Sequence, residues 1–182
     1  MNDLIKRIFS SIILLPLVFY FVISGSLHLL FLIIVCFFVA FYEWHKMTKK
    51  INHKILGFFF LILSFYSFYE ITINYDIIFI LFICVSTDIG GYIFGKFFKG
   101  PKLTKISPNK TYAGMIGGFI VSLIFVSIYL NWINYEITIN LFLVTILLSS
   151  ISQIGDIMIS YFKRLSKIKN TGKIIPGHGG LL

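Results

Sequence analysis

Two carboxylates lie where a membrane protein seldom carries charge. Asp88 and Asp156 both fall inside long apolar runs, each near the end that leads into a basic loop. A carboxylate in a membrane segment costs at least ~2.5–3.5 kcal/mol on insertion scales, so it normally faces a polar cavity or a partner. One interpretation is structural, an aspartate bonded to a lysine or to a neighbouring helix. The other is a metal-holding site within reach of a cytoplasmic nucleotide.

Asp156 belongs to a polar stripe. Gln153, Asp156, Ser160 and Lys163 are spaced so that a helix would bring all four to one face. The stripe offers a carboxylate for a hard cation, a hydroxyl group and a cation for phosphate. Mg²⁺ favours such oxygen sites and often shares them with substrate phosphates, so we expect Mg²⁺ with Asp156 as a ligand.

The loop before residue 112 admits two interpretations. Ser107, Lys110 and Thr111 surround a proline-containing turn and are candidates for phosphate contacts. A plain helix start capped by serine or threonine fits the same residues. Two G-x-x-x-G pairs, Gly91 with Gly95 and Gly114 with Gly118, are explained by close helix packing alone.

The last residues are rich in glycine. Between Asn170 and Gly180, exposed backbone N–H groups together with Lys169, Lys173 and His178 form a candidate cradle for a polyphosphate. Glycine-rich loops are common, so this signal is weak by itself.

The elements that position these residues are membrane helices. Of 182 residues, 58% are hydrophobic and only 13% are charged, and the mean hydropathy is +0.93. A core of this size cannot bury so much apolar surface. Because a bilayer needs roughly 20 apolar residues per helix, the sequence predicts an all-α, polytopic membrane protein. Six spans are expected: Ile8–Ser24, Leu27–Tyr42, Ile55–Tyr69, Ile77–Phe98, Tyr112–Trp132 and Ile137–Phe162.

The basic residues orient these spans. With six spans, all 16 Lys and Arg residues fall on one side, and the opposite loops carry only Glu70, Asp76 and Glu136. The positive-inside rule then predicts a multi-pass protein of the inner (plasma) membrane, with the N-terminus and the basic loops cytoplasmic. Anionic head groups and orientation explain the net charge of +9 better than nucleic acid does. A cleaved signal peptide over residues 1–26 is an alternative for the first span.

Taken together, these segments resemble the bacterial phosphatidate cytidylyltransferase family, also called CDP-diacylglycerol synthase. The family signature runs Gly-Asp, then Ser-x-x-Lys-Arg-x4-Lys-Asp, then Pro-x-His-Gly-Gly-x-x-Asp-Arg. The matching positions are Gly155-Asp156, then Ser160, Lys163, Arg164, Lys169 and Asn170, then Pro176, His178, Gly179 and Gly180. A second match is Asp88 through Gly95, followed by the Ser-Pro-x-Lys-Thr of residues 107–111, and a third, weak match is Glu43-Trp44.

Three departures from the family pattern stand out. Asn170 replaces an aspartate, and Ala113 stands where many relatives have glutamate. The sequence stops at Leu182, where Asp-Arg and a last membrane segment would follow. We therefore expect a fragment of a longer protein, cut within its active site and of uncertain activity as it stands.

The resemblance implies transfer of a nucleotidyl group from CTP to phosphatidate, a membrane lipid, giving CDP-diacylglycerol and pyrophosphate. It implies catalytic roles for Asp156, Ser160, Lys163, Arg164 and Lys169. It implies substrate binding by Asp88, Ser107, Lys110, Thr111, Asn170, His178, Gly179 and Gly180. We expect no nucleic-acid partner and leave a homodimer open.

The expected organisation is a single domain over residues 1–182, with N-terminal helices in 1–76 and the catalytic part in 77–182. Alternatives are a CTP-dependent lipid kinase of related fold and an inactive truncated remnant. A small transporter also carries intramembrane acids, but it does not require the Ser-x-x-Lys-Arg and Pro-x-His-Gly-Gly segments.

Overall fold

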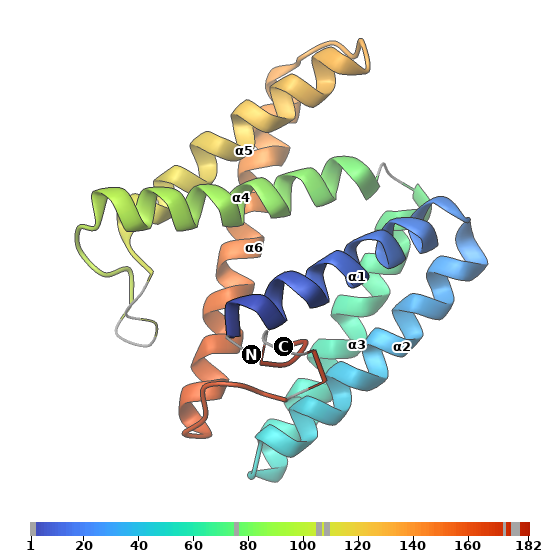
Figure 1. The fold of residues 1–182 in the computed structure, drawn as a ribbon, viewed down its shortest axis with the longest axis vertical. Helices are drawn as coiled ribbons and strands as arrows, with labels where there is room; N and C mark the ends of the chain where they lie inside the picture. The colour runs from blue at the N-terminus through green and yellow to red at the C-terminus, as the bar shows by residue number, and fades with distance from the viewer. Residues whose placement is uncertain (1–2, 75–76, 105–106, 108–109, 173, 176–178) are drawn as a thin grey trace. The chain divides into compact units, whose positions relative to one another are not determined.

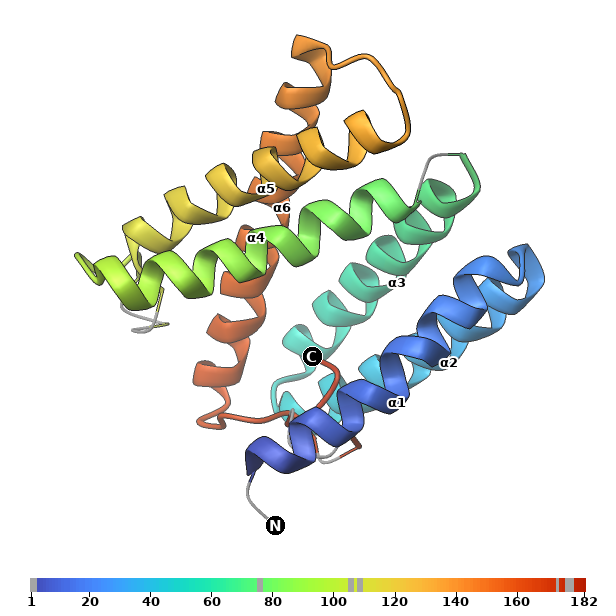
Figure 2. The same cartoon turned by 45° about the horizontal axis from the view of Figure 1, so that its top comes forward.

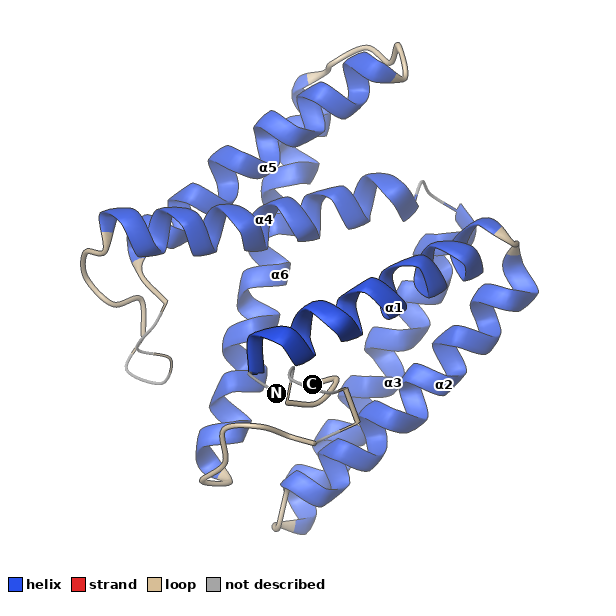
Figure 3. Cartoon of the chain, in the orientation of Figure 1, coloured by secondary structure: helices blue, strands red, loops and turns tan. Residues whose placement is uncertain are grey.

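The computed structural model describes residues 3–74, 77–104, 107, 110–172, 174–175 and 179–182. These residues form helices and loops and no β-strand, apart from an isolated bridge between Lys102 and Thr111 (Figure 3). Six helices follow in chain order: α1 (Asp3–Ile23), α2 (Ser26–Met47), α3 (Ile51–Asn74), α4 (Ile77–Phe98), α5 (Tyr112–Trp132) and α6 (Ile139–Leu165).

The helices have the length and composition of membrane spans. Within the described part of the chain, α2 to α6 each contain a segment long and apolar enough to cross a bilayer, and α1 adds a shorter apolar stretch over Ile12–Ile23. Large apolar side chains remain exposed, among them Leu27 at 78% and Trp132 at 79%. Lipid is the solvent that suits such surfaces, because helices satisfy their own backbone hydrogen bonds. The predicted all-α, polytopic membrane class is confirmed.

The chain divides into two compact units, and the boundary between them falls within α6. The N-terminal unit comprises Met1–Tyr75 and Phe162–Leu182, and the central unit comprises Asp76–Tyr161. The predicted division into N-terminal helices and a catalytic part remains a prediction, because it concerns function.

In the N-terminal unit, α1 and α2 form a tight hairpin (Figure 2). Gly25 precedes α2 with a φ of 105°, a conformation that glycine adopts without strain. The indole of Trp44 lies against α3 so closely that a Cβ atom at Gly57 would overlap it. Trp44 is 1% exposed, and its Nε1 donates to the carbonyl oxygen of His53 at 3.0 Å. This one side chain therefore fastens α2 to α3.

In the central unit, α4 and α5 run side by side (Figure 1). A Cβ atom at Gly90 would overlap the carbonyl oxygen of Gly117, and one at Gly114 would lie 2.7 Å from the carbonyl oxygen of Gly91. Glycines thus let the two backbones touch, as expected for membrane helices. The sequence predicted close packing at Gly91 and Gly114. The two helix backbones approach each other more closely still at Gly90 and Gly117.

Buried hydroxyl groups join α6 to this helix pair. Thr87 Oγ1 donates to Ser149 Oγ at 2.8 Å, and both residues are at most 1% exposed. Gln153 Nε2 donates to the Met115 carbonyl oxygen at 3.4 Å. An apolar cluster of Ile83, Val126, Tyr129 and Leu130 completes the packing of α4 against α5.

Replacing Thr87 with valine keeps the shape and removes the donor to Ser149. We expect the free energy of unfolding in detergent to fall by about 1 kcal/mol, the usual net value of such a bond. Thr145→Val is a matched control, because the Thr145 hydroxyl bonds only to Leu141 in its own helix among the contacts of the described residues. A double-mutant cycle with Ser149→Ala should show coupling, and additive effects would contradict the bond's contribution.

Candidate active site

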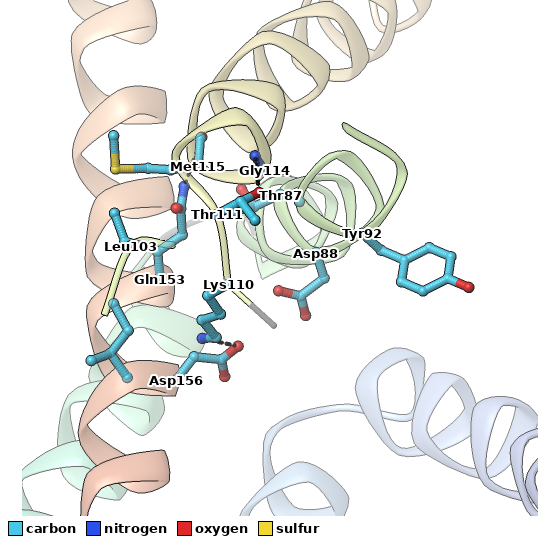
Figure 4. A pocket seen from close by; sticks show the side chains of 12 residues that line it. Thr87, Asp88, Tyr92, Leu103, Lys110, Thr111, Gly114, Met115, Gln153 and Asp156 are labelled. Carbon is cyan, nitrogen blue, oxygen red and sulfur yellow. Dashed lines mark hydrogen bonds and ion pairs between the residues drawn. The ribbon is translucent and has the colours of Figure 1, made fainter. Parts of the chain in front are cut away.

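A pocket that contains two carboxylates and an ammonium group opens in the central unit where α4, α6 and the loop before α5 meet (Figure 4). Its volume is about 190 Å³. Ligand pockets usually enclose ~300–1,000 Å³, so this one suits a phosphate group or part of a nucleotide. Its lining residues are Thr87, Asp88, Gly91, Tyr92, Leu103, Lys110, Thr111, Gly114, Met115, Gln153, Asp156 and Ile157.

An ion pair forms part of the lining of the pocket. Lys110 Nζ donates to Asp156 Oδ2 at 3.0 Å, joining the loop to α6 across 46 residues of sequence. The Asp156 side chain is 62% exposed and that of Lys110 is 28% exposed. Both groups therefore remain accessible to a ligand, and the pair contributes little to stability by itself.

Backbone hydrogen bonds fix the position of Lys110. Its carbonyl oxygen accepts from Leu103 N at 2.8 Å, and its N–H donates to the Ser107 carbonyl oxygen at 3.0 Å. Tyr112 N donates to the Pro101 carbonyl oxygen at 3.2 Å. The loop is thus closed at its base, and the lysine side chain extends from it toward α6 (Figure 4).

Asp88 contributes a second carboxylate from α4. Its side chain is exposed in the same pocket and interacts electrostatically with both Asp156 and Lys110 (Figure 4). Among the described residues, no cluster of three histidine, cysteine, aspartate or glutamate side chains is placed to hold a metal ion. Two carboxylates still fit Mg²⁺, which commonly takes one or two of them and fills its other positions with water and substrate phosphates.

Thr111 and Ser107 both make hydrogen bonds to residues close to them in the sequence. Thr111 is the N-cap of α5, and its Oγ1 accepts from Gly114 N at 3.1 Å. The cap is therefore present, and Thr111 also lines the pocket. Ser107 N donates to Thr104 Oγ1 at 3.1 Å, and Ser107 is outside the pocket lining.

The predicted stripe on α6 is only partly brought to the pocket. Gln153 and Asp156 line it, whereas Ser160, one turn further along α6, does not. Lys163 Nζ donates to the carbonyl oxygen of Leu182 at 2.9 Å, within the N-terminal unit. Arg164 and Lys169 are exposed in that unit. The catalytic roles expected for these residues remain predictions.

The glycine-rich end forms a closed loop in the N-terminal unit. Gly179 and Gly180 have φ angles of 84° and 123°, which few other residues tolerate. A Cβ atom at Gly179 would lie 2.7 Å from Asn170 Oδ1, so Asn170 packs against this turn. Binding of phosphates by Asn170, Gly179 and Gly180 remains a prediction, and His178 lies outside the described residues.

Other lining residues of the pocket were not given a binding or catalytic role from the sequence, and Gln153 was predicted only as part of the stripe on α6. Thr87 precedes Asp88, and Gln153 precedes Asp156 by one helical turn, so their positions were informative. Tyr92 and Met115 carried no signal of their own.

Comparison with known proteins decides the family. The chain matches the sequence profile described as the Cytidylyltransferase family over residues 5–77 and 55–182. The chain belongs to the cytidylyltransferase family. The resemblance seen in the signature residues is thereby confirmed.

Three relatives of this chain carry the same name. The chain is 40% identical to a phosphatidate cytidylyltransferase of Rickettsia prowazekii over 77% of the chain and 67% of that protein. It is 34% identical to a phosphatidate cytidylyltransferase of Rickettsia conorii over 100% of the chain and 84% of the relative. One from Staphylococcus haemolyticus is 49% identical over 53% of the chain but only 38% of the relative's length. No solved structure is significantly similar.

Proposed function

We propose that this protein transfers the cytidylyl group of CTP to phosphatidate, producing CDP-diacylglycerol and pyrophosphate. The family and the names of its relatives support this reaction. The observation that carries it is the Lys110–Asp156 ion pair beside Asp88, in a pocket that opens in a membrane-embedded unit. This pocket offers hard oxygen ligands and an ammonium group together, which is what phosphate chemistry needs.

The proposed reaction exchanges one phosphate bond for another. A phosphate oxygen of phosphatidate bonds to the α-phosphorus of CTP, and the bond from that phosphorus to the bridging oxygen breaks. Pyrophosphate leaves with the electron pair. Positioning and charge neutralisation dominate the catalysis of such a transfer. Lys110 would neutralise a phosphate and Asp156 would hold the Lys110 ammonium in place. Lys163, Arg164 and Lys169 would neutralise further phosphates, and Ser160 would donate a hydrogen bond to one.

Mg²⁺ is the proposed cofactor, held by Asp156 with Asp88 beside it. When bound, it would supply charge neutralisation on the phosphates of CTP. The remaining ligands would come from substrate oxygens and water, since the described side chains of the pocket offer two carboxylates.

The membrane setting suits the lipid substrate. Phosphatidate would enter from the side between helices, because its acyl chains leave the bilayer only at a large cost. The basic loops, Lys110 among them, would face the cytoplasm, where CTP is dissolved. This orientation puts both substrates at the same membrane surface.

The direct test measures pyrophosphate release in detergent with Mg²⁺. We would assay this chain and a version extended beyond Leu182 by the corresponding segment of the Rickettsia conorii relative. Release should require both CTP and phosphatidate. A well-folded extended protein that releases no pyrophosphate with both substrates present would contradict the proposal.

Lys110→Met should lower kcat/KM for CTP roughly 10–100-fold, because it removes the ammonium group that the pocket presents to a phosphate. Lys102→Met is the matched control, since Lys102 is exposed on the same loop but does not line the pocket. Equal activities of the two variants would exclude Lys110 from substrate binding.

A further inference from the structure

A buried carboxylate accepts hydrogen bonds from the C-terminal loop of the N-terminal unit. Glu43 is 0% exposed. Its Oε2 accepts three hydrogen bonds: from Thr171 Oγ1 at 2.7 Å, Leu181 N at 2.9 Å and Leu182 N at 3.1 Å. Thr171 is 128 residues away in sequence, so these bonds fix a long-range contact. Carboxylates are almost never fully buried unless they are paired in this way.

The loop is shaped around this carboxylate. A Cβ atom at Gly172 would overlap Glu43 Oε1, and one at Gly180 would lie 2.7 Å from Oε2. Gly172 N donates to the Gly179 carbonyl oxygen at 3.0 Å, which closes the turn. Glycine at both positions is therefore what allows the backbone to approach Glu43.

The helix that carries Glu43, α2, is held in place by the neighbouring residue. Trp44, the next residue on α2, is buried and bonds to the His53 carbonyl oxygen. Its ring also packs edge-on against Phe162 at 4.8 Å between centroids. Glu43 is thus presented from a helix that cannot rotate without breaking both contacts.

Glu43 Oε1 is also buried and receives no hydrogen bond from the described residues. An unsatisfied buried oxygen costs free energy. Stability alone therefore does not explain why a glutamate occupies this position. Energetically unfavourable features persist where the surrounding structure holds them, and they cluster at functional sites.

We propose that Glu43 is a positioning residue for nucleotide binding: it holds residues 171–172 and 179–182 in the conformation that receives the phosphates of CTP. This inference rests on the proposed function, because the loop contains Gly179 and Gly180 of the Pro-x-His-Gly-Gly signature. Glu43 does not touch the substrate. It acts through Thr171 and through the backbone N–H groups of Leu181 and Leu182.

The test is hydrogen–deuterium exchange of the purified protein, with and without CTP and Mg²⁺. In Glu43→Gln, which keeps the shape and removes the charge, the amides of residues 171–172 and 179–182 should exchange roughly tenfold faster. CTP should slow their exchange in the unmodified protein, and Glu43→Gln should need roughly tenfold more CTP for the same protection.

Two further variants make the test decisive. Thr171→Val removes one of the three donors and should give an intermediate effect, even if Glu43→Gln folds poorly. Glu70→Gln is the matched control, the same chemical change on α3 in the same unit, and should exchange like the parent.

Unchanged loop exchange in both Glu43→Gln and Thr171→Val would overturn the inference, as would CTP that protects no loop amide in the parent. In turnover, a positioning role raises KM for CTP, whereas a purely structural role lowers kcat at constant KM. Loss of the proposed function appears separately, as absent pyrophosphate release from a protein whose loop exchange still depends on Glu43.

Discussion

Replacing Asp156 with asparagine should lower the rate of cytidylyl transfer about 10²–10³-fold, the usual loss when one preorganised electrostatic contact is removed. The change is nearly isosteric but removes the negative charge that lies 3.0 Å from Lys110 Nζ. It also removes a carboxylate ligand for the proposed Mg²⁺. The measurement is the initial rate of lipid product formation at saturating CTP, in the extended protein if the chain alone is inactive.

The control for Asp156→Asn is Glu136→Gln. Glu136 is an exposed acid of the central unit, in the connection between α5 and α6, away from the pocket. Its variant should keep the parent rate. Asp156→Asn combined with Lys110→Met should be little worse than Asp156→Asn alone, because the two groups act as a pair. An Asp156→Asn protein with at least half the parent rate would contradict the assigned role.

Gly90→Ala should destabilise the central unit by about 3 kcal/mol, at the upper end of overpacking effects. Its Cβ atom would overlap the backbone oxygen of Gly117, which cannot move without separating α4 from α5. The better helix propensity of alanine returns only ~1 kcal/mol. The measurement is thermal unfolding in detergent, where a loss of this size lowers Tm by roughly 5–10 °C.

Gly155→Ala is the matched substitution for this prediction. Gly155 is also in a helix, but a Cβ atom there meets no other atom within 4 Å. Its Tm should stay the same or rise slightly. Equal Tm values for the two alanine variants would show that the α4–α5 contact is looser than the structure indicates.

Helix positions followed closely from hydropathy. The predicted spans Ile77–Phe98 and Tyr112–Trp132 coincide with α4 and α5. α3 was predicted as Ile55–Tyr69 and extends over Ile51–Asn74. Polar residues such as Asn52 and Glu70 end a hydropathic run without ending the helix, since they suit the membrane surface. Hydropathy therefore located the spans and underestimated their ends.

The site was predicted residue by residue but not as an assembly. Asp88 and Asp156 were recognised because charge inside an apolar run needs an explanation. Their meeting with Lys110 depends on how α4, α6 and a loop pack, which no local pattern encodes. The glycine contacts differ from the predicted G-x-x-x-G contacts for the same reason. Adjacent helix positions point about 100° apart, so the G-x-x-x-G spacing did not reveal that Gly90 lies closest to α5.

Glu43 shows the same limit more clearly. It was noted only as part of a weak Glu-Trp match, although it binds a loop 128 residues away. A buried glutamate next to a buried tryptophan at a helix end carries no sequence signature of its partner. Only the folded chain connects it to Thr171.

The assigned reaction is tested by following two labels of CTP, one on the α-phosphate and one on the γ-phosphate, into the lipid fraction. The extended protein is incubated with phosphatidate and Mg²⁺, beside its Asp156→Asn variant. We expect the α-label to enter the lipid, the γ-label to leave as pyrophosphate, and both rates to fall about 10²–10³-fold in Asp156→Asn. Transfer of the γ-label to lipid would instead mean a CTP-dependent lipid kinase, and α-label transfer by Asp156→Asn at half the parent rate or more would place the chemistry outside this pocket.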